Sequence, residues 1–352
     1  MIVCSHCGSC GQSNSIHLPA RHGWDAGRGS GDAGWATFVS GGIVVIAEIA
    51  EITQSRAVSA VDVEKLKHYI HKELFDTRFP TTPPIAKWND RHQETVIYTN
   101  QNVTLPAGTA TYALVPGGGH GAWCYEPVKM LLEDAGQTVY AVSLPGVGER
   151  ADELTTNTCL EDHIQAVADF ITEHDLHDVI LVGHSYGGMV ITGAADRVPD
   201  RVKNIVYLDA VHPANGQSLL DAQSLVQYVP AVSQPRTVDG VEVNLYPDED
   251  TITFLGLTEP LDVVFAKEHL TPHPWKTFTD KLQLENADIV SEIGKTDIYT
   301  KTTLDGLLQA GLVTEDEAKN AMVIDTGHDL MITEPKLTAD MLLNAAAEIY
   351  GN

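Results

Sequence analysis

Residues 179–191 of the chain have the sequence VILVGHSYGGMVI, with Ser185 at the centre. The apolar run from Val179 to Val182 is typical of a buried strand, and the residues after Gly187 favour a helix. A G-x-S-x-G sequence between a strand and a helix predicts a tight turn that exposes the serine hydroxyl. Since this hydroxyl then lies beside a helix N-terminus, the stretch predicts a nucleophilic serine.

Segments typical of strands alternate with segments typical of helices on both sides of this turn. The expected strands lie at 94–100, 109–119, 138–146, 178–185, 204–211, 295–303 and 322–324, and the expected helices at 125–136, 160–175, 189–198 and 337–351. Such alternation predicts an α/β fold with a mostly parallel sheet flanked by helices. The alternation stops at about 212–285, between late strands. We expect this insertion to form a cap over the carboxyl edge of the sheet, where open α/β sheets bind ligands.

The first 93 residues differ from the rest of the chain. Residues 1–40 are rich in Gly, Ser and His without periodicity, and residues 61–75 have the apolar spacing of an amphipathic helix. We therefore expect 1–93 to be a partly disordered N-terminal extension with one helix. Residues 94–352 are expected to form the α/β domain.

Three of the five cysteines, Cys4, Cys7 and Cys10, lie in this extension with spacings found in metal sites. A closed zinc site needs four ligands, and no second C-x-x-C sequence is present, although a nearby histidine could supply a ligand. We expect a disordered extension rather than a metal site. The predicted chemistry needs no cofactor.

Composition excludes some classes of partner. The 352-residue chain has a formal net charge of −26, whereas binding to nucleic acid or to an anionic membrane requires clustered Lys and Arg. No apolar run reaches the length of a membrane span, and the short apolar segment 41–52 contains Glu48 and Glu51, unlike the core of a signal peptide. We expect a cytoplasmic protein, with export as the alternative. Its expected partner is a small molecule, and a homodimer is possible.

A serine nucleophile needs a base, which follows the last strand of such a sheet. His328 lies after the apolar strand Met322–Ile324 and a turn at Gly327. The chain has fifteen histidines, so this position rather than the residue type favours His328. We predict that His328 is the base that takes the proton of Ser185.

The base needs a carboxylate that orients its ring. Asp305 follows the strand before His328 and precedes Gly306, so we predict that Asp305 is the triad acid. Asp209, at the end of the earlier strand 204–211, is the alternative, because some enzymes with this arrangement take the acid from there.

The glycine-rich turn in LVPGGGHGAW, residues 114–123, follows a strand directly and can expose backbone N–H groups. Such groups stabilise the oxyanion formed when a nucleophile attacks a carbonyl. We predict that the amides of Gly118 and Tyr186 form this oxyanion hole, with Gly117 or Gly119 as alternatives to Gly118. The spacing of phosphate-binding glycine loops is absent.

These motifs together resemble the α/β-hydrolase superfamily, in particular the branch of plant methylesterases, hydroxynitrile lyases and related bacterial carboxylesterases. The resemblance covers about residues 95–352. It rests on the sequences Gly119–Trp123, Gly183–Gly188 and Gly327–Asp329, and on the strand before Asp305.

The resemblance implies an α/β-hydrolase fold with a catalytic triad, an oxyanion hole and a cap. It assigns Ser185 as nucleophile, Asp305 as acid, His328 as base, and the amides of Gly118 and Tyr186 as oxyanion donors. The implied activity is that of a carboxylesterase-type serine hydrolase acting on a small-molecule ester through an acyl-enzyme. The substrate-binding residues are not identified by the sequence.

Other functions share this machinery. A lactonase or a thioesterase would use the same triad, and a ligand receptor would retain slow hydrolysis. A hydroxynitrile lyase is disfavoured by two positions. The lyases of this branch have a threonine where this chain has Gly117 and a lysine where it has Asp329.

Overall fold

The computed structural model describes residues 85–87, 96–98, 109–223, 235–244 and 249–351. The chain divides into two units, residues 1–76 and 77–352, and all described residues belong to the second. The expected helix at 61–75 and the cysteines of the extension lie outside the described residues. Within the described part, no helix has both the length and the hydropathy needed to cross a membrane.

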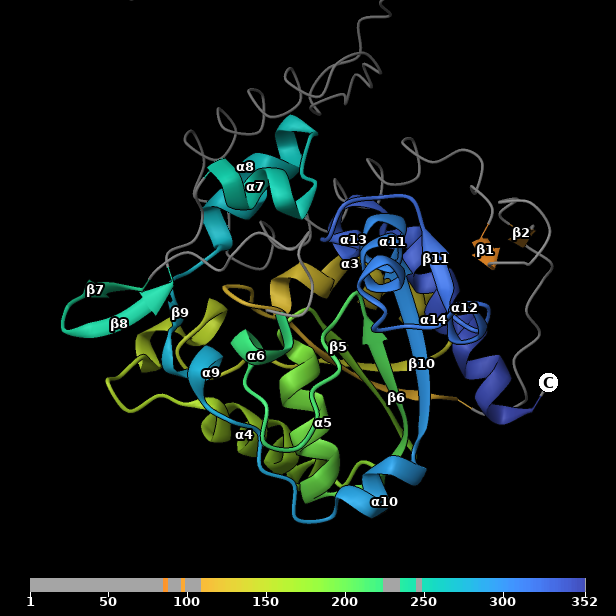
Figure 1. The fold of residues 1–352 in the computed structure, drawn as a ribbon, viewed down its shortest axis with the longest axis horizontal. Helices are drawn as coiled ribbons and strands as arrows, with labels where there is room; N and C mark the ends of the chain where they lie inside the picture. Colours follow the sequence, from red (N-terminus) through yellow and green to blue (C-terminus); the bar gives the residue numbers. More distant parts are fainter. Residues whose placement is uncertain (1–84, 88–95, 99–108, 224–234, 245–248, 352) are drawn as a thin grey trace, which may run out of the picture. The chain divides into compact units, whose positions relative to one another are not determined.

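An eight-stranded sheet forms the centre of the second unit (Figure 1). Its strands lie in the order β2 (Val96–Tyr98), β1 (Ile85–Lys87), β11 (Met322–Ile324), β10 (Gly294–Thr300), β6 (Val202–Leu208), β5 (Val179–His184), β3 (Thr111–Val115) and β4 (Thr138–Ala141). The six strands from β11 to β4 are parallel, whereas β1 and β2 pair antiparallel at one edge. The mostly parallel sheet is therefore confirmed, and β1 extends it to residues before the expected boundary at 94.

The strand register places the predicted site residues at one end of the sheet. On β5, Gly183 is opposite Val115 of β3 and Tyr207 of β6. Parallel neighbours in this register end at the same level. The turns that follow β3, β5 and β6 therefore meet at the carboxyl edge of the sheet, as expected for an open α/β fold.

Helices cover both faces of the sheet (Figure 1). Their bounds are α3 (Glu126–Asp134), α4 (Leu160–Glu173), α5 (Gly187–Arg197), α10 (Ala287–Glu292), α11 (Lys301–Ala310), α12 (Glu315–Ala318), α13 (Leu330–Thr333) and α14 (Pro335–Tyr350), with 3-10 turns η1 (Ala122–Tyr125), η2 (Gly148–Glu153) and η3 (Pro199–Arg201). Alternate side chains of β3 point to opposite faces. Tyr112 and Leu114 pack with residues of α3 and α14, whereas Ala113 and Val115 pack with residues of α4 and α5. Both faces of the sheet are therefore buried.

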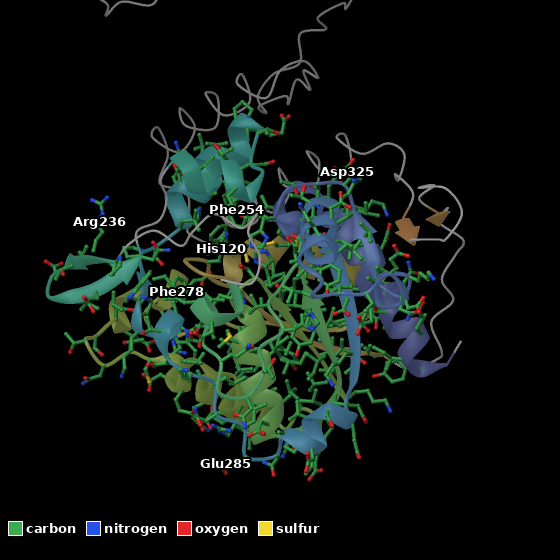
Figure 2. All side chains as sticks on the ribbon, in the orientation of Figure 1. His120, Arg236, Phe254, Phe278, Glu285 and Asp325 are labelled. Carbon is green, nitrogen blue, oxygen red and sulfur yellow. The ribbon has the colours of Figure 1, made fainter. Side chains whose placement is uncertain are left out.

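The insertion at 212–285 contains short elements instead of strands of the main sheet. They are α6 (Leu219–Gln223), β7 (Arg236–Val238), β8 (Val241–Asn244), α7 (Glu249–Leu255), α8 (Pro260–His269), β9 (His273–Pro274) and α9 (Lys276–Thr279). The strands β7, β8 and β9 form a separate antiparallel sheet. Asp239 and Gly240 join β7 to β8 with φ angles of 50° and 84°, as a two-residue hairpin turn requires. Figure 2 shows Arg236 projecting from this hairpin, whose strand β7 is exposed.

Candidate active site

Ser185 lies between the buried strand β5 and helix α5, in a left-handed conformation with φ of 53°. This conformation is strained for a residue with a side chain, and it persists because the neighbouring elements hold it. A β-carbon on Gly183 would lie 2.8 Å from the Gly187 carbonyl oxygen. One on Gly187 would lie 2.8 Å from the Val115 carbonyl oxygen. The predicted glycines therefore allow the close packing that forms the turn.

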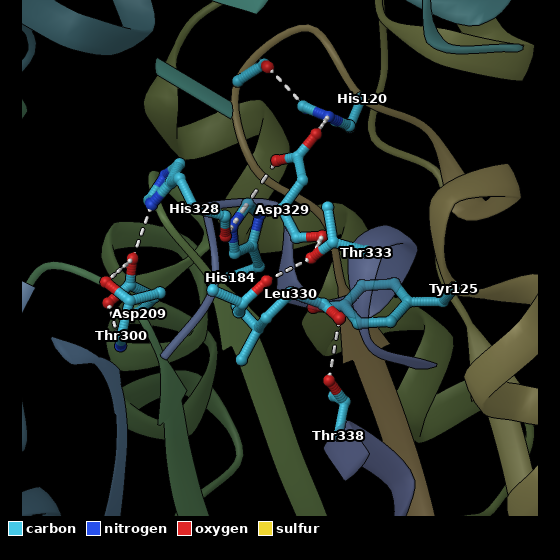
Figure 3. A network of polar contacts seen from close by, with 12 residues as sticks. His120, Tyr125, His184, Asp209, Thr300, His328, Asp329, Leu330, Thr333 and Thr338 are labelled. Carbon is cyan, nitrogen blue, oxygen red and sulfur yellow. Dashed lines mark hydrogen bonds and ion pairs between the residues drawn. The ribbon is translucent and has the colours of Figure 1, made fainter. Parts of the chain in front are cut away.

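His328 follows β11 and lines the same cavity as Ser185. Its Nδ1 lies 2.7 Å from Oδ2 of Asp209 (Figure 3). Because a carboxylate oxygen only accepts, Nδ1 carries the proton, and in the neutral ring Nε2 is free to accept one. Nε2 is buried and has no hydrogen-bond partner among the described residues. A general base for Ser185 requires this tautomer.

Asp209 follows β6 and is buried, with φ of 46°. Its Oδ1 accepts from the Thr300 amide at 2.9 Å. Its Oδ2 accepts from the hydroxyls of Thr300 at 3.3 Å and Thr303 at 3.0 Å, in addition to His328. Burial opposes the charge, but the bonds from His328, Thr300 and Thr303 keep the pKa of Asp209 below its ordinary value. Asp209 is therefore a charged partner for the ring of His328.

Asp305 does not contact His328, and its prediction as the triad acid was wrong. Strand β10 ends at Thr300, whose side chain accepts from the Thr303 amide and caps α11. Asp305 therefore lies one turn into this helix. There its exposed carboxylate pairs with Lys301 at 2.6 Å. The alternative weighed from the sequence, Asp209, takes the place beside His328.

The glycine loop after β3 is held in place on several sides. The Gly119 amide donates to Nδ1 of His273 at 3.0 Å, and its carbonyl accepts from the Thr271 amide at 3.0 Å. The Gly118 carbonyl lies 2.8 Å from Nδ1 of His120. The amide of Gly118, by contrast, has no acceptor among the described residues. An oxyanion donor must have its amide free of protein acceptors, and the role of Gly118 as such a donor stays a prediction.

Tyr186 is the residue after the serine, at the N-terminus of α5. Its amide has no acceptor among the described residues either. Its buried hydroxyl lies 2.9 Å from Nδ1 of His163, whose Nε2 lies 2.8 Å from the Pro145 carbonyl oxygen. Burial lowers the pKa of His163 to about 4, so the ring is neutral and accepts the hydroxyl proton of Tyr186. The side chain thus serves packing, and the amide remains the predicted oxyanion donor.

His184, which precedes the serine, supports the backbone of His328. Its Nε2 lies 3.0 Å from the backbone carbonyl oxygen of His328 and donates to it. Burial, together with the nearby His328, lowers the pKa of His184 to about 3, so this ring stays neutral. Sequence reasoning missed this role, as it missed Thr300 and Thr303. The sequence signal for His184 and Thr300 is their position at strand ends, whereas Thr303 lies in the first turn of α11.

The cavity that contains Ser185 and His328 has a volume of about 310 Å³. Its wall includes apolar side chains of the insertion and of the α11–α12 segment, such as Phe254, Leu307 and Leu312. Polar side chains, including His212, Asp297 and Tyr299, line another part. Among the described residues, no group of three or more His, Cys, Asp or Glu side chains is arranged to hold a metal ion.

A serine in a strained strand–helix turn, a histidine after the last strand and a buried aspartate define the class of α/β-fold proteins with a hydrolase-type triad. Comparison of the chain with known protein families gives the same class. The model of the alpha/beta hydrolase family matches residues 113–341, and the chain belongs to this family.

Relatives with curated descriptions include esterases. A carbendazim hydrolyzing esterase of Nocardioides sp. (strain SG-4G) is 49% identical over 111 residues, which cover 32% of this chain and 46% of that protein. Methylesterase 7 of Arabidopsis thaliana is 30% identical over 250 residues, 67% of this chain and 95% of that protein. For several curated relatives the chain spans only about half of their length, for example 43% of putative methylesterase 15 of Arabidopsis thaliana.

Solved structures show the same fold. An extracellular alpha/beta-hydrolase from a Paenibacillus species is 26% identical with a TM-score of 0.53, covering 67% of this chain and 98% of that one. Polyneuridine aldehyde esterase has a TM-score of 0.57 at 22% identity, covering 68% of this chain and all of that one, and supports the fold alone.

Proposed function

We propose that this protein is a serine esterase that cleaves carboxylic esters through an acyl-enzyme. The observation that carries the proposal is the 2.7 Å contact between His328 and Asp209 in the cavity that also contains Ser185. The relatives named as esterases and methylesterases support it.

In the first half of the reaction, Oγ of Ser185 attacks the ester carbonyl carbon while its proton passes to Nε2 of His328. Asp209 stabilises the imidazolium that forms. The carbonyl oxygen becomes an oxyanion and accepts from the amides of Gly118 and Tyr186. When this intermediate collapses, the bond to the alcohol oxygen breaks and His328 returns its proton to the leaving alcohol.

In the second half, water replaces the alcohol. His328 takes one proton from the water, whose oxygen attacks the acyl carbon bound to Ser185. The same amides bind the second oxyanion. Its collapse releases the carboxylic acid and returns the proton from His328 to Ser185, so the enzyme is regenerated without a cofactor.

The cavity favours a compact ester that carries both an apolar and a hydrogen-bonding group. A volume of about 310 Å³ is at the small end of ligand sites. Phe254 and Leu307 offer apolar contact. In the polar part, Nε2 of His212 lies 3.0 Å from Asp297 and 3.4 Å from the Tyr299 hydroxyl, which forms a polar group for the substrate to contact.

The geometry disfavours a hydroxynitrile lyase. A β-carbon on Gly117 would lie 2.8 Å from Nδ1 of His184 and 2.9 Å from the β-carbon of Ser185, so the threonine of the lyases has no room here. The residue after His328 is the buried Asp329, which cannot supply the positive charge that the lysine of the lyases carries at this position. Lactone and thioester cleavage would use the same triad, so lactones and thioesters belong in the substrate panel. The cytoplasmic location stays a prediction from the sequence.

The test is turnover by wild type, Ser185→Ala and Ser291→Ala on a panel of esters, lactones and thioesters. Ser291 is the matched control, because it lies on α10 and its hydroxyl donates to the Asp288 carbonyl. We expect the Ser185→Ala variant to lose at least about a thousandfold in kcat and Ser291→Ala to stay near wild type. Equal ester turnover by wild type and Ser185→Ala would refute the proposal. Tight binding of an ester without turnover by wild type would instead indicate a receptor.

A further inference from the structure

Besides the triad, the site contains a second, fully buried pair of titratable residues. Nε2 of His120 lies 3.0 Å from Oδ2 of Asp329, and both side chains are inaccessible (Figure 3). His120 belongs to the loop after β3, whereas Asp329 directly follows His328 in the chain. The pair therefore links the loop that carries Gly118 to the segment that carries the base.

Both ring nitrogens of His120 contact atoms that accept hydrogen bonds. Nδ1 lies 2.8 Å from the Gly118 carbonyl oxygen, which can only accept. Nε2 contacts the carboxylate of Asp329. With a proton on both nitrogens the ring is an imidazolium, and the pair is a buried ion pair. Burial opposes this state, but Asp329 raises the pKa of His120, and His120 keeps the pKa of Asp329 below its ordinary value.

Other groups around the pair do not compete for this contact. The ring of His184 is neutral and its Nε2 is 3.9 Å from Oδ1 of Asp329. Cys124 and Tyr125 of η1 are buried, and their pKa values are raised above the ordinary range by burial, so both stay uncharged. His120 is thus the charged partner of Asp329.

The backbone of His120 also contacts the glycine loop. Its amide donates to the Gly117 carbonyl at 3.3 Å. In a planar trans peptide the Gly118 N–H points opposite to the Gly117 carbonyl, so this bond sets the direction of that N–H. The ring of His120 fixes the carbonyl of the next peptide, whose amide at Gly119 is held by His273. Since three successive glycines have little conformational preference of their own, these contacts determine the loop geometry.

We infer that His120 and Asp329 are positioning residues of the oxyanion hole, holding the Gly118 amide at a fixed place relative to His328. This inference rests on the proposed esterase function. The pair touches neither substrate nor reacting atoms. Its removal should therefore weaken stabilisation of the transition state more than binding of the substrate.

The main test compares His120→Phe/Asp329→Leu with Tyr112→Phe, under saturating and subsaturating ester. The double variant removes both charges together, so that no buried charge is left unpaired. We expect kcat to fall about tenfold to a hundredfold, a part of what loss of an oxyanion donor costs, with KM changed less than about threefold. Tyr112 donates a buried hydrogen bond to the Leu342 carbonyl in the sheet core, and its loss should leave kcat near wild type.

A conservative variant separates positioning from packing. Asp329→Asn retains a hydrogen bond to Nε2 of His120, so the bond from Nδ1 to Gly118 can persist. This variant should keep more than about a third of wild-type kcat. A double variant that folds with wild-type kcat would overturn the inference, as would an Asp329→Asn variant as slow as the double variant.

A readout that does not depend on turnover comes from nitrogen NMR of the wild-type protein. At about pH 8, both ring nitrogens of His120 should show shifts of a doubly protonated imidazole, with the resonance assigned by its loss in His120→Phe. A His120 ring without a proton on Nδ1 could not donate to the Gly118 carbonyl, and it would overturn the inference even if ester turnover is confirmed. Absence of ester turnover with an imidazolium at His120 would instead refute only the esterase proposal.

Discussion

The assignment of the triad acid makes a strong prediction, because the two candidate aspartates have different environments. Asp209 is buried and accepts from His328, Thr300 and Thr303. In Asp209→Asn, the amide oxygen can keep the bond from the Thr300 backbone, which places the NH₂ group toward His328. That group donates to Nδ1 and forces the proton of the neutral ring onto Nε2.

A ring with its proton on Nε2 cannot take the proton of Ser185. The same change in a serine-protease triad lowers kcat by about 10,000-fold. Because the Asp209–His328 contact has the same form, we expect a loss of similar size, about 5 kcal/mol in activation free energy. Asp305→Asn removes only an exposed pair with Lys301, and kcat should change less than about twofold.

The assay is steady-state hydrolysis of the best ester of the panel, with both variants checked for folding by near-ultraviolet circular dichroism and urea denaturation. An Asp209→Asn variant that is folded and less than about tenfold slower than wild type would refute the assignment of Asp209. A large loss of kcat in Asp305→Asn would show that Asp305 takes part in catalysis, and it would also refute the assignment of Asp209.

Three further predictions concern the surroundings of the triad. Gly117→Ala should lower kcat at least about tenfold, because the new methyl group would displace His184 or Ser185; wild-type kinetics would contradict this. Thr303→Val should lower the free energy of unfolding by about 2 kcal/mol in urea titrations, since a charged acceptor loses a donor; an unchanged urea midpoint would argue against it. Below about pH 6.5 the unfolded chain protonates His163 and His184 while the folded protein does so only near pH 4 and 3. The free energy of unfolding should therefore fall by about 1 kcal/mol or more per pH unit between pH 6.5 and 4, and a flat urea midpoint over this range would exclude the neutral buried rings.

The sequence was sufficient to predict the alternating strands, the turn at Ser185 and the position of His328 after the last strand. These features depend on local patterns: apolar runs, glycines that permit close packing, and chain order. The strand-ending Asp209 and the hairpin sequence at Asp239–Gly240 also belong to such patterns.

The choice between Asp305 and Asp209 depended on where strand β10 ends. The sequence IYTKTTLD is compatible with a longer strand, but the Thr300 side chain caps α11 and ends the strand five residues before Asp305. A helix cap depends on the fit of one hydroxyl to one backbone amide, and such a contact is difficult to predict from a single sequence. The contacts of His120 with Asp329 were beyond sequence reasoning, because they join residues 209 positions apart.

The contacts of Gly119 with Thr271 and His273 have a consequence for divergence within the family. These two residues belong to the insertion that also forms part of the cavity wall, yet they hold the backbone of the loop with the predicted oxyanion donor. A chimaera that received this insertion from a relative would exchange the loop supports along with the pocket wall. New specificity obtained by recombination here should therefore require compensating changes at the loop, whereas point substitutions on the α11–α12 segment leave those supports in place.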